Sequence, residues 1–287
     1  MTQYGFYPGC SLESLAVSYG MSTMETTREL GLDLVELDDW NCCGATSYFH
    51  VDQLFAYTLV ARNIAIAERE GLDFVTPCSG CYMNAYFTNK YLKEDPDLAE
   101  HINYALAADD LTLHGTTKVR HLLEVFIEDV GYEAIKAKTT RPLDGIKVAA
   151  YYGCQLVRPR KDGEEIENPQ YFEKLMEAIG ADAVDFASKT RCCGGALMVT
   201  NRKAALDMVL RLLQDAENRE ADVIATICPM CNINLEVYQR QVNREFGTNF
   251  AIPALYFTQL IGLAMGIAPG RLGIGKELVH LTPSLLA

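Results

Sequence analysis

The most constraining feature of this 287-residue sequence is the arrangement of its ten cysteines, which fall into two sets with the same internal order. Each set has one cysteine, then an adjacent pair, then a Cys-x-x-Cys segment. The two gaps within a set are 31 and 34 residues in the first and 37 and 34 residues in the second. A repeat that uses every cysteine predicts a duplicated chain. The first set is Cys10, Cys42, Cys43, Cys78 and Cys81, and the second is Cys154, Cys192, Cys193, Cys228 and Cys231.

The residues near the cysteines repeat as well. A glycine precedes the first cysteine of each set, and an asparagine (Asn84 or Asn234) stands three residues after each Cys-x-x-Cys segment. The halves meet near an Arg-Pro dipeptide, which is typical of a linker. We therefore predict an N-terminal domain over residues 1–141 and a C-terminal domain over 142–287.

Hydrophobic patterning predicts alternating strands and helices in both halves. Such alternation is typical of parallel βαβ units, so we expect an α/β fold of two pseudo-two-fold related, Rossmann-like parallel-sheet halves. Residues 93–110 are expected to form an acidic connection. Strands are predicted at 4–7, 32–37, 73–76, 118–120, 146–151, 182–186, 222–226 and 250–252. Helices are predicted at 11–30, 51–71, 82–92, 122–130, 170–179, 203–221, 232–246 and 258–265.

The cysteines fall just after predicted strands and just before predicted helices. In a parallel sheet these positions share the carboxyl edge, where such folds bind ligands. Helix N-termini and unpaired amides at this edge favour thiolates. Each half should therefore gather five sulfur atoms at one place.

Several kinds of site use cysteine, and the number five helps to choose among them. Structural disulfides are disfavoured in a reducing compartment, and an adjacent pair would form a strained bond. A thioredoxin-like site needs one Cys-x-x-Cys pair, and a structural zinc needs four ligands. An ordinary [4Fe-4S] cubane also needs four thiolates. Five thiolates favour an iron–sulfur cluster that is larger or more open than a cubane. Zinc at one of the two sites is an alternative that the sequence does not exclude.

Composition excludes other classes of protein. With 25 Lys+Arg against 38 Asp+Glu, the net charge of -13 argues against nucleic-acid binding. The N-terminus does not resemble a signal peptide, and the apolar stretch 252–268 is too short and broken to span a membrane. We expect a cytoplasmic protein. We find no dinucleotide or P-loop motif and expect no flavin or NAD in this chain, so electrons must come from a partner.

Three further features have both a functional and a structural interpretation. His50 follows the first cysteine pair and could donate a proton to a departing thiolate, or could be an ordinary helix histidine. Arg158, Arg160 and Lys161 follow Cys154 and could hold an anionic part of a substrate, or could form a solvated loop. The segments 252–265 and 278–286 could dock a partner or belong to the core.

The doubled cysteine signature resembles the CCG cysteine-rich domain family, and its two complete copies are most similar to the B-type subunit of heterodisulfide reductase and its bacterial homologues. This resemblance implies that each set of five cysteines holds a noncubane [4Fe-4S] cluster, with no catalytic residue required beyond these ligands. It also implies two partners, a ferredoxin-like [4Fe-4S] subunit of the C type and a flavin-containing subunit of the A type.

The resemblance further implies the reaction. Two clusters facing each other would each bind one sulfur and supply one electron, so that a disulfide is reduced to two thiols, or two thiols are oxidised. The substrate would be the disulfide of coenzymes M and B, another small disulfide, or a carrier-bound one. The alternative is a non-catalytic electron-transfer subunit of a dehydrogenase complex.

Overall fold

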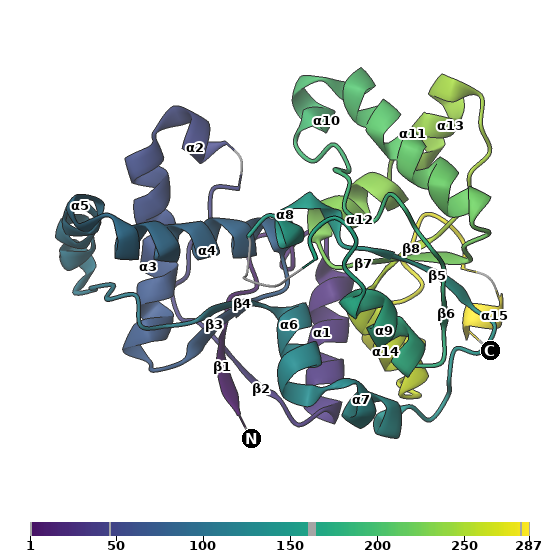
Figure 1. Ribbon diagram of the computed structural model, residues 1–287, viewed down its shortest axis with the longest axis horizontal. Helices are drawn as coiled ribbons and strands as arrows, with labels where there is room; N and C mark the ends of the chain where they lie inside the picture. The colour runs from purple at the N-terminus through teal and green to yellow at the C-terminus, as the bar shows by residue number, and fades with distance from the viewer. Residues whose placement is uncertain (1, 46, 160–164, 282, 287) are drawn as a thin grey trace.

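The computed structural model describes residues 2–45, 47–159, 165–281 and 283–286, which form two four-stranded parallel sheets (Figure 1). The strand order is β2-β1-β3-β4 in one sheet and β6-β5-β7-β8 in the other. Because equivalent strands take equivalent places, the predicted α/β class with two parallel-sheet halves is confirmed. The strands are β1 Gln3–Phe6, β2 Asp33–Glu36, β3 Asp73–Thr76, β4 Val119–His121, β5 Lys147–Tyr151, β6 Asp182–Ala183, β7 Val223–Thr226 and β8 Ala254–Tyr256.

The register of the central strands brings the cysteines of each half level with one another. Tyr4 pairs with Asp73, and Val148 pairs with Val223. Tyr4 lies six residues before Cys10, and Asp73 lies five residues before Cys78. Val148 and Val223 precede Cys154 and Cys228 by the same two distances. The chain therefore leaves both central strands at the same height, at the carboxyl edge of the sheet.

Helices connect the strands and cover the sheets, and side-chain caps fix where several of them begin. Asp52 accepts a hydrogen bond from the amide of Phe55, and Asn201 does the same for Ala204 at the matching place in the second half. The first-half helices are α1 Val17–Glu29, α2 Tyr48–Val51, α3 Gln53–Arg69, α4 Ser79–Glu94, α5 Pro96–Leu106, α6 Leu122–Val125 and α7 Tyr132–Lys138. The second-half helices are α8 Gly153–Val157, α9 Tyr171–Ala178, α10 Leu197–Thr200, α11 Arg202–Asn218, α12 Pro229–Glu236, α13 Gln239–Phe246, α14 Phe257–Ala264 and α15 Pro283–Leu286.

Some predicted elements were wrong for identifiable reasons. The helix expected over 232–246 is two helices. In a continuous helix the carbonyl of Leu235 would accept from the backbone amide of residue 239, but here it accepts from the side chain of Gln239. The helix expected from residue 11 begins at Val17, since residues 11–16 form turns. The acidic connection contains helix α5, which is capped by the carboxylate of Asp95. The last strand lies at 254–256 rather than 250–252.

The two halves share a buried interface. Helix α14 packs along α1, near the middle of the molecule in Figure 1, and the hydroxyls of Ser22 and Thr258 lie 2.6 Å apart between these helices. Residues 252–264 are buried, so this segment is core rather than a docking surface. The boundary between residues 141 and 142 stays a prediction. Within the described ranges, no helix combines the length and apolarity needed to cross a membrane.

Candidate metal centre

Both cysteine sets lie at the carboxyl ends of the parallel strands. In the first half Cys10 follows β1, the pair Cys42 and Cys43 follows β2, and Cys78 is the N-cap of α4 after β3. The second half repeats this placement with Cys154 after β5, Cys192 and Cys193 after β6, and Cys228 as the N-cap of α12 after β7. The remaining cysteine of each Cys-x-x-Cys segment lies in the first turn of its helix.

In the first set the sulfur atoms are within contact distance in pairs. The Sγ atoms of Cys10 and Cys42 are 3.8 Å apart, and those of Cys43 and Cys81 are 3.3 Å apart. Hydrogen bonds from Cys42 and then Cys81 hold the pKa of Cys43 well below its ordinary value. Cys43 is thus the position in this set where the structure best stabilises a thiolate.

The second set has a similar arrangement. The Sγ atoms of Cys193 and Cys231 are 3.5 Å apart. Hydrogen bonds from Cys154 and Cys193, together with the amide of Gly194, lower the pKa of Cys192 to about 2. The pKa of Cys193 is raised to about 12, chiefly because it donates to Cys192. This half therefore also favours a thiolate within its cysteine pair.

An asparagine holds each cysteine pair in place. Asn84 Nδ2 donates to the carbonyls of Cys43 (3.3 Å) and Ala45 (3.0 Å) and lies 3.8 Å from Cys43 Sγ. Asn234 donates to the carbonyls of Cys193 (2.9 Å) and Gly195 (3.3 Å) in the same way. No role was predicted for these asparagines from the sequence, and their repetition at equivalent places was the signal that could have indicated one.

The glycine before each first cysteine is required by its surroundings. Gly9 and Gly153 have φ angles of +71° and +67°, which L side chains rarely adopt. A Cβ added at either position would lie 3.2 Å from a sulfur atom, that of Cys81 or Cys231. The backbone here is therefore closely fitted to the thiols.

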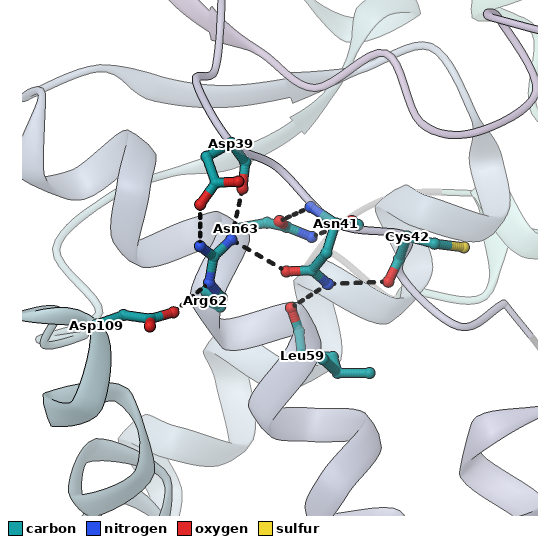
Figure 2. Close-up of polar contacts among 7 residues, drawn as sticks. All are labelled: Asp39, Asn41, Cys42, Leu59, Arg62, Asn63 and Asp109. Atoms are coloured by element: carbon teal, nitrogen blue, oxygen red, sulfur yellow. Dashed lines mark hydrogen bonds and ion pairs between the residues drawn. The ribbon is translucent and has the colours of Figure 1, made fainter.

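Charged residues support the first cysteine pair from the outside, as Figure 2 shows. Arg62 on α3 forms ion pairs with Asp39 and with Asp109, the latter at 2.7 Å, and donates to the carbonyl of Asp39. Asn41 Nδ2 donates to the carbonyl of Cys42 at 3.0 Å. The loop before Cys42 is thereby attached to α3.

The second cysteine pair is supported by a buried ion pair instead. Lys189 Nζ lies 2.7 Å from a carboxylate oxygen of Glu173, and both side chains are almost fully buried. The hydroxyl of Tyr152 donates to the same carboxylate. The amide of Gly153 donates to the carbonyl of Lys189 at 2.9 Å, which links the Cys154 segment to the Cys192 segment.

The two cysteine sets meet at the interface between the halves. The thiols of Cys78 and Cys228 interact across this interface, which raises the pKa of Cys78 and, after the larger effect of Cys231, helps to lower the pKa of Cys228. Gln155 crosses the same interface, since a Cβ added at Gly80 would lie 3.0 Å from its Oε1. Sequence patterns gave no signal for either contact, because both depend on how the halves pack.

A cavity of about 430 Å³ opens beside this meeting point. Cys154, Cys192, Cys228 and other members of the second set line it, together with Ser79, Gln155 and Arg158. His50, from the first half, lines this cavity as well and so lies across from the second set. Arg160 and Lys161 lie outside the described residues.

His50 also lines a smaller cavity of about 250 Å³. Its walls are mostly aromatic, from Phe49, Tyr57, Phe87 and Tyr91, and Asn84 forms part of its lining. It is therefore an apolar space next to the first cysteine set. A larger cavity of about 590 Å³ beside β4 has no cysteine in its lining.

The donor chemistry of these sets fits iron–sulfur clusters. Cysteine thiolates are the ligands of iron–sulfur clusters, and each half offers five thiols, hydrogen bonds that stabilise thiolates, and glycine backbone close to the sulfur atoms. Among the residues that the structure describes, no three Cys, His, Asp or Glu side chains are arranged around one point as ligands of a single metal ion. The sulfur contacts that we find are pairwise.

Comparison with known proteins identifies the family. The model of the "Cysteine-rich domain" CCG family matches residues 4–85 and again 148–236. The chain belongs to this family.

The sequence is 36% identical, over 98% of this chain and 95% of the relative, to the B-type subunit of the ferredoxin/F420H2-dependent CoB-CoM heterodisulfide reductase of Methanosarcina acetivorans. It is 34% identical, over 98% of both chains, to the 8-methylmenaquinol:fumarate reductase membrane anchor subunit of Wolinella succinogenes. The predicted resemblance to the B-type subunit of heterodisulfide reductase is thus confirmed.

One solved structure shares the fold. A hypothetical protein from Helicobacter pylori superposes with a TM-score of 0.79 over 98% of this CCG protein, at 15% sequence identity. This chain spans about half of that one (52%). At this identity the likeness concerns the fold alone.

Proposed function

We propose that this CCG protein is the disulfide-cleaving iron–sulfur subunit of a heterodisulfide reductase-type complex. The reaction converts a disulfide, two electrons and two protons into two thiols, or runs in reverse. The observation that carries the proposal is that the second cysteine set lines a cavity of about 430 Å³ that also reaches the first half, at His50 and at Ser79, the residue after Cys78. A disulfide has two sulfur atoms and needs two electrons, which two adjacent redox sites can serve.

Each set of five cysteines would hold one noncubane [4Fe-4S] cluster, which when bound supplies one-electron redox chemistry and iron that can take up sulfur. The first would be bound by Cys10, Cys42, Cys43, Cys78 and Cys81, the second by Cys154, Cys192, Cys193, Cys228 and Cys231. With no flavin or NAD proposed in this chain, electrons would come from a ferredoxin-like subunit of the C type and a flavin-containing subunit of the A type, in the cytoplasm.

Side chains in the cavity would bind and orient the substrate. Arg158 is exposed, lines the cavity, and lies close enough to Cys154 and Cys192 to stabilise their thiolates. It is suited to hold an anionic group of the disulfide, and from the sequence alone Arg160 and Lys161 are proposed for the same role. His50 would donate a proton to a departing thiolate from the opposite wall.

The test is disulfide reduction by the metal-loaded chain with a reduced viologen dye as electron donor. Two substrates are compared, a small disulfide with an anionic group and a neutral one of similar size. Arg158→Gln should raise KM for the anionic disulfide about tenfold, the loss of about 1.4 kcal/mol of binding, and leave the neutral disulfide unchanged. The matched control is Arg211→Gln, at an exposed arginine of α11 that pairs with Asp207. If the loaded chain reduces neither disulfide, the proposal is wrong.

A second candidate function is electron transfer with a quinol, without disulfide chemistry. The aromatic cavity of about 250 Å³ beside the first cysteine set favours it, since its size and walls suit a planar ring. The name of the Wolinella succinogenes relative includes a menaquinol. One assay distinguishes the two functions. If the protein transfers electrons with a quinol, a short-chain naphthoquinol would reduce the metal sites of the loaded chain. Phe87→Ala would then slow this reduction without affecting disulfide reduction.

A further inference from the structure

One tyrosine lies on the boundary between the two cysteine sets. Tyr19, on α1, is fully buried. Its ring stacks on that of Tyr256 from the second half, with centroids 4.1 Å apart and planes inclined by 6°. Phe257 meets it edge-on at 6.2 Å. The ring is therefore held rigidly by residues of the other half, which fixes where its hydroxyl lies.

The hydroxyl of Tyr19 contacts both halves at equivalent points. It lies 3.1 Å from the carbonyl of Pro77 and 3.3 Å from that of Ile227. These residues directly precede Cys78 and Cys228, the first members of the two Cys-x-x-Cys segments. A single O–H group thus serves as a shared donor to the peptide groups that lead into both cysteine sets.

Other groups nearby do not replace this contact. His121 is fully buried close to the same two carbonyls, but its Nε2 makes no hydrogen bond of good geometry within the described residues. The hydroxyl pair of Ser22 and Thr258 joins α1 to α14 without touching either cysteine segment. Within the described residues, Tyr19 thus provides a side-chain hydroxyl that donates to both segments at once.

We propose that Tyr19 is a positioning residue that fixes the separation of the two cysteine sets at Cys78 and Cys228, and with it the coupling between the two metal sites. The inference rests on the proposed function in one respect, that each set holds a redox-active cluster. With the hydroxyl present the two segments keep one relative position. Without it they sample several, while each set keeps its own ligands.

Two other tyrosines supply matched controls. The hydroxyl of Tyr7 donates to the carbonyl of Asn41 at 2.9 Å, and that of Tyr151 to the carbonyl of Arg191 at 2.6 Å. Each of these carbonyls directly precedes the cysteine pair of one half only. A Tyr→Phe change removes the same buried hydroxyl at all three positions, but only at Tyr19 does the loss concern both halves.

The test uses the loaded chain, purified without oxygen, and reads the magnetic interaction between the two reduced clusters by electron paramagnetic resonance, with iron and sulfide measured on the same samples. We expect one defined splitting in the parent chain and in Tyr7→Phe and Tyr151→Phe, each of which alters the signal of one site. In Tyr19→Phe the defined splitting should be lost and replaced by a distribution, at unchanged iron content. A 3-fluorotyrosine at position 19, which keeps the donor, should restore it.

The inference is overturned if Tyr19→Phe keeps the parent splitting, or if Thr258→Val, which loosens the same interface elsewhere, broadens it equally. Loss of iron from either site in Tyr19→Phe also contradicts the inference, because each cysteine set is expected to keep its own ligands. A parent chain without two clusters would instead refute the proposed function, which the metal analysis reveals before any spectrum is compared.

Discussion

Replacing Gly153 by alanine should remove metal from the second site while destabilising the fold only modestly. The left-handed backbone at φ +67° costs alanine about 1–2 kcal/mol. The new Cβ would lie 3.2 Å from Cys231 Sγ, so this sulfur must retreat by a few tenths of an ångström. A ligand displaced in this way weakens the site that it completes, and we expect loss of about half of the iron, roughly four atoms of eight.

The control separates backbone strain from the contact with sulfur. Gly247 has the same φ of +67°, but an added Cβ there would meet nothing within 4 Å. Gly153→Ala and Gly247→Ala should therefore show the same backbone cost in urea unfolding, while only Gly153→Ala loses iron. Gly9→Ala should mirror the result at the first site. A Gly153→Ala chain that keeps all its iron, or equal iron loss in Gly153→Ala and Gly247→Ala, would contradict a specific effect of the Cβ on Cys231.

Three further changes test other parts of the account. Lys189→Met should lower the free energy of unfolding by about 3–5 kcal/mol, because the Glu173 carboxylate is left buried without its ion-pair partner. The double variant with Lys189→Met and Glu173→Leu should recover most of this loss. Equal stability of the single and double variants in urea unfolding would contradict the prediction. Asn84→Asp should lower the reduction potential of the first site alone, because a carboxylate replaces an amide donor beside Cys43. A redox titration in which the potentials of both sites shift equally would contradict a role of Asn84 at the first site. Burial lowers the pKa of His121 from 6.5 to about 4, so on acidification the unfolded chain binds the proton before the folded chain does. The contribution of neutral His121 to stability should be complete above pH 6.5 and should fall by up to about 3 kcal/mol between pH 6.5 and 4. In urea unfolding, His121→Gln should lack this pH-dependent contribution.

The sequence was most informative where chemistry and local patterning agree. The ten cysteines, each placed between a strand and a helix, predicted two thiol sites at the carboxyl edges of two parallel sheets. Parallel strands carry this information because their ends must align, as the register of Tyr4 with Asp73 shows. Asn84 repeated in Asn234, and that repetition was the available signal for a supporting role.

Contacts between the halves could not be predicted in this way. The approach of Cys78 to Cys228 and the shared hydroxyl of Tyr19 depend on the packing of α1 against α14, for which hydrophobic patterning gives no geometry. The placement of His50 against the second cysteine set has the same origin. The break between α12 and α13 was hidden because the side chain of Gln239, rather than a proline or glycine, ends the helix.

We propose that this CCG protein holds two iron–sulfur clusters, each with five cysteine ligands. Iron, zinc and acid-labile sulfide per chain, measured after purification without oxygen, test it most directly, on the parent chain and on Cys43→Ala. We predict about eight irons with matching sulfide and no zinc in the parent, and loss of iron from one site in the variant. About four irons with one zinc, or a Cys43→Ala chain with all its iron, would contradict the account.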